Sequence, residues 1–141
     1  MGMSNPLTSR TAPSDDARTF VGTVHHVSFR VDDLDEALAF YEGILGCRRL
    51  PRPASLDSVP GIWLEAGSTQ VHLIEAPADE DRGFPPKRIV PGCGHIAFHT
   101  DDLDAAEHSL RERGLEVERG KLLPQLFVQD PSGNLIEFTP F

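Results

Sequence analysis

A twelve-residue string occurs twice in this chain and constrains its fold more than any other feature. The copies occupy residues 26–37 and 95–106, 69 positions apart, and seven of the twelve positions are identical. Both copies keep the histidine, the phenylalanine and the run Asp-Asp-Leu-Asp. Because a repeat at a fixed offset indicates a duplicated structural unit, we expect two similar modules.

The start of each copy has the alternation of a strand. In residues 20–31, Val27, Phe29 and Val31 fall on one face and His26 on the other, which predicts a strand with an apolar face for packing against a helix. His25 should then point away from His26. The second copy repeats this pattern, with His95 on its polar face.

The end of each copy has the pattern of a helix. The paired aspartates favour a helix start, and apolar side chains then recur at helical spacing. Gly46 and Gly114 stand where a C-terminal cap belongs. The first helix is therefore expected to have about three turns, and the second is expected to end at Gly114.

Hairpin signals complete each module. Residues 62–66 and 69–75 flank Gly67-Ser68, a turn that would place Trp63 opposite His72. In the second half, residues 115–119 suit a short strand, and residues 125–129 and 134–139 flank a Pro- and Gly-containing turn. We therefore predict an α+β fold in which two tandem βαβββ modules form a curved mixed sheet cup with helices outside.

The predicted domain boundaries follow composition. Residues 1–19 are polar and proline-containing and are expected to form a disordered leader. The single folded domain then spans residues 20–141, with module one at 20–76, a linker at 77–91 and module two at 92–141.

Charge and hydropathy exclude several classes of function. The net charge is −9 and the pI is about 5.0, which disfavours nucleic acid as a partner. No apolar run approaches the roughly 18 residues of a membrane span, and no signal peptide is visible. We expect a cytoplasmic protein with two reduced cysteines and no membrane partner.

Four side chains form a candidate metal site. His26 and His95 correspond through the repeat, and His72 and Glu137 occupy the last strand of each module. Imidazole nitrogens and a carboxylate oxygen suit borderline divalent metals. Side chains predicted on the same faces are candidates for substrate contact: Arg30, Trp63 and His99.

Several segments resemble the vicinal oxygen chelate superfamily, which includes glyoxalase I, methylmalonyl-CoA epimerase, fosfomycin-resistance proteins, extradiol dioxygenases and bleomycin-binding proteins. The resemblance covers roughly residues 22–141 and is carried by residues 26–46, His-Leu-Ile-Glu at 72–75, Gly-His-Ile-Ala-Phe at 94–98 and Asp-Pro-Ser-Gly-Asn-Leu-Ile-Glu-Phe at 130–138. The family's metal ligands fall on His26, His72, His95 and Glu137. The slot of His72 is usually glutamate in glyoxalase I and glutamine in the epimerase.

The resemblance implies a divalent-metal-dependent, glyoxalase-like lyase or isomerase. Such an enzyme would chelate vicinal oxygens of a small substrate and stabilise an enediolate-like intermediate, with Glu137 as the catalytic base and Ni, Zn, Mn, Fe or Co as the metal. It also implies a homodimer, because sites in several members are built from two chains. The alternatives are a fosfomycin-type resistance metalloenzyme, a non-catalytic drug- or metabolite-binding protein, and an extradiol dioxygenase.

Overall fold

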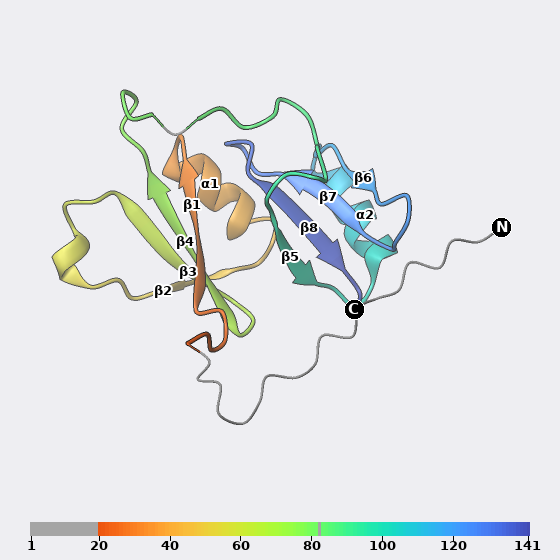
Figure 1. Cartoon of the computed structure of the whole chain (residues 1–141), viewed down its shortest axis with the longest axis horizontal. Helices are drawn as coiled ribbons and strands as arrows, with labels where there is room; N and C mark the ends of the chain where they lie inside the picture. The colour runs from red at the N-terminus through yellow and green to blue at the C-terminus, as the bar shows by residue number, and fades with distance from the viewer. Residues whose placement is uncertain (1–19, 82) are drawn as a thin grey trace.

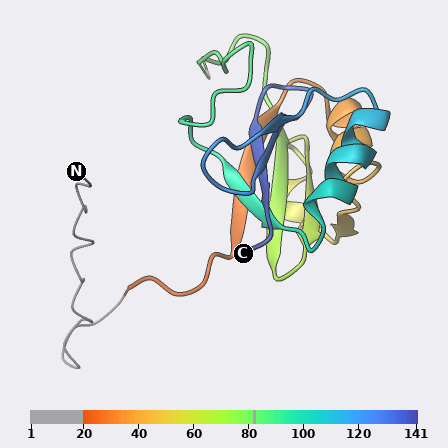
Figure 2. The same ribbon diagram turned by 90° about the vertical axis from the view of Figure 1, so that its right-hand side faces the viewer.

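The structure, a computed structural model, describes residues 20–81 and 83–141, so the predicted leader lies outside the described residues. Within these ranges two four-stranded sheets lie side by side (Figure 1). Two helices cover the same side of both sheets (Figure 2). The arrangement confirms the α+β class and the two βαβββ modules.

Module one carries a mixed sheet with strand order β1-β4-β3-β2. Strand β1 runs parallel to β4, and the β3–β4 and β2–β3 pairs are antiparallel. Its elements are β1 (His26–Val31), α1 (Leu34–Tyr41), β2 (Arg48–Leu50), the 3-10 helix η1 (Ala54–Leu56), β3 (Gly61–Ala66) and β4 (Thr69–Glu75).

Module two repeats this topology with strand order β5-β8-β7-β6 and a parallel β5–β8 pair. Strand pairing therefore yields two separate sheets of like design. The elements of module two are β5 (Ile96–His99), α2 (Leu103–Glu112), β6 (Glu118–Arg119), β7 (Leu126–Gln129) and β8 (Leu135–Thr139).

The repeated string forms the strand–helix unit that its pattern predicts. The carboxylate of Asp33 accepts the backbone N–H of Glu36, and that of Asp102 accepts the N–H of Ala105, each at 2.9 Å. Both aspartates are therefore N-caps. The apolar strand faces and the helices of both modules share one core, whose fully buried members include Val31, Tyr41, Leu64, Leu73, Leu126 and Ile136.

Two predicted boundaries in module one are wrong, and one of its strands was not located in the sequence. Strand β1 begins only at His26, helix α1 ends at Tyr41 after eight residues, and β2 was not predicted. The segment 42–45 continues as turns, and Gly46 has a positive φ of 77°. Glycines at 43 and 46 make a further helical turn costly, which explains the shorter helix.

Contacts between the modules gather at the end of β1. Tyr41 donates its hydroxyl hydrogen to Asp130 at 2.7 Å. The side chain of Asn134 donates to the carbonyl of Arg30 at 3.0 Å, and the N–H of Asp32 donates to Ser132 at 2.9 Å. The turn between β7 and β8 therefore holds module one in place.

The linker runs from β4 to β5 and passes on the side where β1 has its C-terminal end (Figure 1). Ile89 is buried against Phe127 and Leu135, in a small cluster separate from the main core. The backbone carbonyl of Pro86 accepts from Gln129 at 2.9 Å. No helix in the described ranges is long and apolar enough to cross a bilayer.

Candidate metal centre

Strand register places His26 and His72 on one face of the first sheet. His72 lies opposite Ser28 on β1 and Trp63 on β3, and His26 lies opposite Gln70. The pairing of Trp63 with His72 is the predicted one. This face points away from α1, because the alternate residues of the same strands form the core.

Three rings form a stack on this face. The indole of Trp63 lies on the His72 imidazole with centroids 4.3 Å apart and planes 3° apart. The His26 ring covers the other side, with centroids 4.0 Å apart and planes 14° apart. The orientation of the His72 ring is therefore determined by packing on both faces.

His72 is buried and electrically neutral at ordinary pH. Burial lowers the pKa of His72, and electrostatic interactions with His26, His25 and Arg52 lower it further. Its Nε2 donates to Oε1 of Gln70 at 2.9 Å, so Nδ1 keeps a free lone pair. A neutral ring with one nitrogen already bonded is the form in which histidine binds metals.

The prediction that His25 points away from His26 is wrong. The Nδ1 atoms of the two residues lie 2.9 Å apart, and the His25 ring centroid lies 6.4 Å from that of His72. Strand alternation does not apply to His25, because β1 begins one residue later. A third imidazole therefore stands at the edge of this half of the site.

The second half of the site pairs His95 with Glu137. Nε2 of His95 lies 2.8 Å from Oε2 of Glu137, and the side chains are 24% and 8% exposed. Nδ1 of His95 donates to the carbonyl of Cys93 at 2.7 Å. Since a carbonyl only accepts, Nδ1 carries the proton, and Nε2 is the nitrogen available to a metal.

The carboxylate of Glu137 is held in an otherwise apolar place. Phe127 lies opposite it in the β7–β8 register, and the edge of that ring contacts His95 at a centroid distance of 5.7 Å. The second carboxylate oxygen, Oε1, accepts a short hydrogen bond from the side-chain amide of Gln125. A buried carboxylate is costly unless cations or hydrogen bonds offset its charge.

The donor set fits a divalent cation, but one chain does not bring its members together. His26 and His72 belong to the sheet of module one, whereas Glu137 belongs to the sheet of module two and His95 immediately precedes its strand β5. In the described part of the chain, no three His, Cys, Asp or Glu side chains cluster as metal ligands. The four candidate ligands therefore stand as two pairs.

Two arginines lie near the stacked rings of Trp63, His72 and His26. Arg30 shares its face of β1 with His26 and forms a 2.9 Å ion pair with Glu80 of the linker through Nη1. Its Nε and Nη2, and Nε of Arg52, are buried without a hydrogen-bond partner in the described structure. The guanidinium of Arg52 lies over Gly61, where a Cβ atom would approach it to 2.9 Å.

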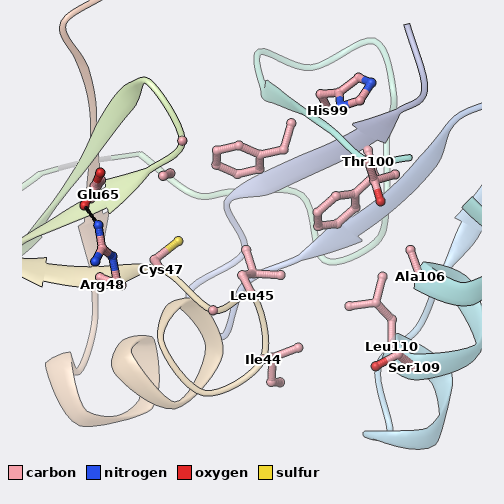
Figure 3. Close-up of a pocket in the computed structure, with 15 residues that line it drawn as sticks. Ile44, Leu45, Cys47, Arg48, Glu65, His99, Thr100, Ala106, Ser109 and Leu110 are labelled. Carbon is pink, nitrogen blue, oxygen red and sulfur yellow. Dashed lines mark hydrogen bonds and ion pairs between the residues drawn. The ribbon is translucent and has the colours of Figure 1, made fainter. Parts of the chain in front are cut away.

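A cavity of about 520 Å³ lies elsewhere, between the modules on the helix side. In Figure 3, Ile44 and Leu45 from module one face Ala106 and Leu110 from module two. Of the predicted site residues, only His99 borders this cavity, and its Nε2 lies 3.2 Å from the carbonyl of Pro140. A role for His99 in substrate binding stays a prediction.

The sequence pattern did not reveal three functional neighbours. Gln70 could have been found, because it shares strand parity with His72. Arg52 lies in an irregular loop, where parity gives no direction. Gln125 precedes β7, and its side chain could be assigned to the face of Glu137 only once the hairpin register was known.

Comparisons with known proteins agree with this architecture. Residues 23–138 match the family described as Glyoxalase/Bleomycin resistance protein/Dioxygenase superfamily. The chain is 34% identical over 122 residues to Glyoxylase I 4 of Arabidopsis thaliana, covering 82% of this chain and 68% of that protein. It is 31% identical over 131 residues to the mitochondrial methylmalonyl-CoA epimerase of Homo sapiens, covering 83% and 73%.

Structural comparison leads to the same family. A Bacillus anthracis protein assigned to the glyoxalase family superposes with a TM-score of 0.72 at 29% sequence identity, covering 86% of this chain and 97% of that one. Relatives of this chain thus include a lyase-type and an epimerase-type enzyme by name. The chain belongs to the glyoxalase/bleomycin resistance protein/dioxygenase superfamily.

Proposed function

We propose that the protein is a divalent-metal-dependent lyase or isomerase that removes a proton next to a carbonyl group of a small substrate. The observation that carries this proposal is the contact of His95 Nε2 with Glu137 Oε2 at 2.8 Å, with Nδ1 of His95 already bonded to Cys93. The lone pair of His95 Nε2 and a buried oxygen of Glu137 are thus close enough to bind the same cation. The names of the relatives support this reaction class.

The proposed centre combines the two pairs from different chains of a homodimer. His26 and His72 of one protomer would join His95 and Glu137 of its partner to give three imidazoles and one carboxylate. Support comes from the separation of the pairs within the described part of one chain and from the polar faces of both sheets, which point away from the helices. A closed two-fold dimer would contain two such centres.

The residues of the chain have distinct parts in the reaction. Glu137 is the base, because it is the carboxylate among the four candidate ligands. His72 stays neutral and keeps a lone pair toward the site. The bound metal would supply Lewis-acid stabilisation of negative charge on the substrate oxygens.

The substrate of this proposal carries an anionic group. The unpartnered nitrogens of Arg30 and Arg52 lie near the stacked rings of Trp63, His72 and His26. A guanidinium group pairs well with a carboxylate or a phosphate. Glu80 occupies one nitrogen of Arg30, so a substrate anion would compete with it or bind beside it. Trp63 would form an apolar wall beside the reacting atoms.

Metal analysis combined with solvent exchange tests this function. We expect purified protein to bind about one divalent ion per chain, and to exchange the proton next to a carbonyl for deuterium in the hemithioacetal of methylglyoxal or in a 2-methyl-branched acyl thioester. Chelation should abolish exchange, and added metal should restore it. Protein that takes up no Ni, Zn, Mn, Fe or Co would contradict the proposal.

A further inference from the structure

Gln125 is the hydrogen-bond partner of one oxygen of Glu137, and the other oxygen contacts His95. Its side-chain amide donates to Oε1, while Oε2 contacts Nε2 of His95. Glu137 is only 6% exposed, so water cannot freely replace the amide. The amide of Gln125 therefore fixes Oε1, and Oε2 is the oxygen left facing His95.

The chemistry of the amide suits this position. A lysine or arginine here would neutralise the carboxylate and weaken its attraction for a cation. A glutamine donates a hydrogen bond without adding charge, so the negative charge of Glu137 stays available. Hydrogen-bond partners of this kind orient metal ligands and tune their affinity.

Gly120 leaves the space that the Gln125 side chain occupies. A Cβ atom on Gly120 would lie 2.9 Å from Oε1 of Gln125 and 2.7 Å from the carbonyl oxygen of Leu123. The N–H of Gly120 also donates to the carbonyl of Gln125 at 2.9 Å, just beyond the β6–β7 pairing. Backbone and side chain of Gln125 are thus both located by one glycine.

We propose that Gln125, backed by Gly120, is a positioning residue that orients Glu137 to present a single oxygen, Oε2, to the metal and to the substrate proton. This inference rests on the proposed metal function. Gly120 and Gln125 would act together, although neither contacts Oε2, the proposed ligand atom of Glu137. The same hydrogen bond would hold the carboxylate plane while Oε2 carries the proton.

The test measures Co²⁺ binding by calorimetry and by visible absorption, since the Co²⁺ spectrum reports its ligand set. We expect Q125L and G120A to lose roughly ten- to a hundredfold in Co²⁺ affinity. Q125E, which is nearly the same size, should also lose affinity, because an ionised carboxylate only accepts hydrogen bonds and cannot donate to Oε1 of Glu137. All three spectra should differ from that of the unmodified protein.

Q129L is the matched control. Gln129 lies on the same face of the same hairpin, but its amide donates to Pro86 and Gly133 instead of Glu137. We expect Q129L to bind Co²⁺ with unchanged affinity and an unchanged spectrum. Melting temperatures of the metal-free proteins identify any variant that loses affinity merely because it is unfolded, and Q125E serves if Q125L is unstable.

The outcomes separate the two proposals. Unmodified protein that binds no Co²⁺, Ni²⁺, Zn²⁺ or Mn²⁺ would overturn the metal function and the role of Gln125 with it. Unmodified protein that binds Co²⁺ while folded Q125L and Q125E bind it equally tightly, with the same spectrum, would overturn only the role of Gln125. Equal losses in Q125L and Q129L would indicate general damage to the hairpin and likewise overturn it.

Discussion

The hydrogen bond between Tyr41 and Asp130 joins the two modules through buried side chains. Tyr41 is fully buried and Asp130 is 4% exposed. The other oxygen of Asp130 accepts two backbone N–H groups of its own turn, from Ser132 and Asn134. Tyr41 is thus hydrogen-bonded to a turn that also contacts the end of β1.

Removing the hydroxyl should loosen this junction. We expect Y41F to lower the free energy of unfolding by about 2 kcal/mol, because a buried acceptor loses a charge-assisted partner. Denaturant titration of both proteins measures the difference. L38A, which trims a partly buried leucine of the same helix, separates loss of the hydrogen bond from loss of packing. An unchanged midpoint in Y41F would contradict the assigned role.

Tyr41 also predicts the alkaline limit of stability. Burial, followed by the nearby Asp130, raises the pKa of Tyr41 far above its usual range. The folded protein therefore keeps a proton that the unfolded chain loses near pH 10, so stability is intact below about pH 10 and falls as the pH rises further. Because Tyr41 is the only tyrosine, tyrosinate absorbance should appear only with unfolding. Ionisation in a still-folded protein, judged by circular dichroism, would refute this.

At the residue scale, strand parity predicted the right faces for His26, His72 and Glu137. Parity failed for His25, because the residue lies just outside the strand and its backbone is free of the alternation. It also could not find Gln125, whose approach to Glu137 depends on tertiary register and on the missing side chain of Gly120. The local sequence pattern thus predicts on which face of a strand a side chain lies, whereas tertiary packing determines which side chains contact each other.

At the element scale, the linker is anchored at two places that belong to different halves of the site. Glu80 pairs with Arg30 of module one, and Ile89 is buried against Phe127 and Leu135 of module two. Phe127 lies directly opposite Glu137 on the neighbouring strand. Burial of Ile89 thus ties the linker to the wall of the His95–Glu137 pair.

The Ile89 anchor should control access to the linker. Trimming it to alanine removes apolar burial worth about 2 kcal/mol, so I89A should loosen the backbone at the adjacent Lys87 and Arg88, whose side chains are already exposed to trypsin. We expect faster cleavage at these residues, measured by mass spectrometry of timed digests, with the modules still folded. V59A, at an exposed valine of another loop, should not change the rate. Equal cleavage of I89A and the unmodified protein would argue against this anchor.

Element prediction succeeded where side-chain chemistry was explicit and failed where it was not. Asp33 and Asp102 mark the helix starts, and Gly67-Ser68 marks the β3–β4 turn. Strand β2 has only three residues, Arg48–Leu50, two of them arginines. Its strand character comes from pairing with β3, a tertiary contact that no local pattern contains.

At the scale of the whole molecule, the duplication divides the proposed site in two. Each sheet carries one pair of candidate ligands on the face that points away from the helices. The shared core lies on the opposite faces and holds the modules of one chain together. The repeat therefore predicts the architecture of each half-site, whereas the way the halves combine depends on assembly, which a single chain does not encode as a local pattern.

Mixing two defective proteins tests whether the halves combine between chains. One variant, H26A/H72A, lacks the module-one pair, and the other, H95A/E137A, lacks the module-two pair. If the centres lie between protomers, each heterodimer contains one complete centre and one that lacks all four ligands. Equal mixing with random exchange should then restore about a quarter of the metal sites of the unmodified dimer.

The same experiment distinguishes the alternative arrangement. If each chain builds its own centre, every centre in the mixture lacks two ligands, and no tight binding returns. Refolding the two variants together from denaturant ensures exchange, and sedimentation measures the dimer fraction. Each variant refolded alone is the control for residual binding by a single pair. Recovery of tight metal binding and of deuterium exchange in proportion to the heterodimer fraction would establish the shared centre, and recovery of neither despite efficient heterodimer formation would contradict it.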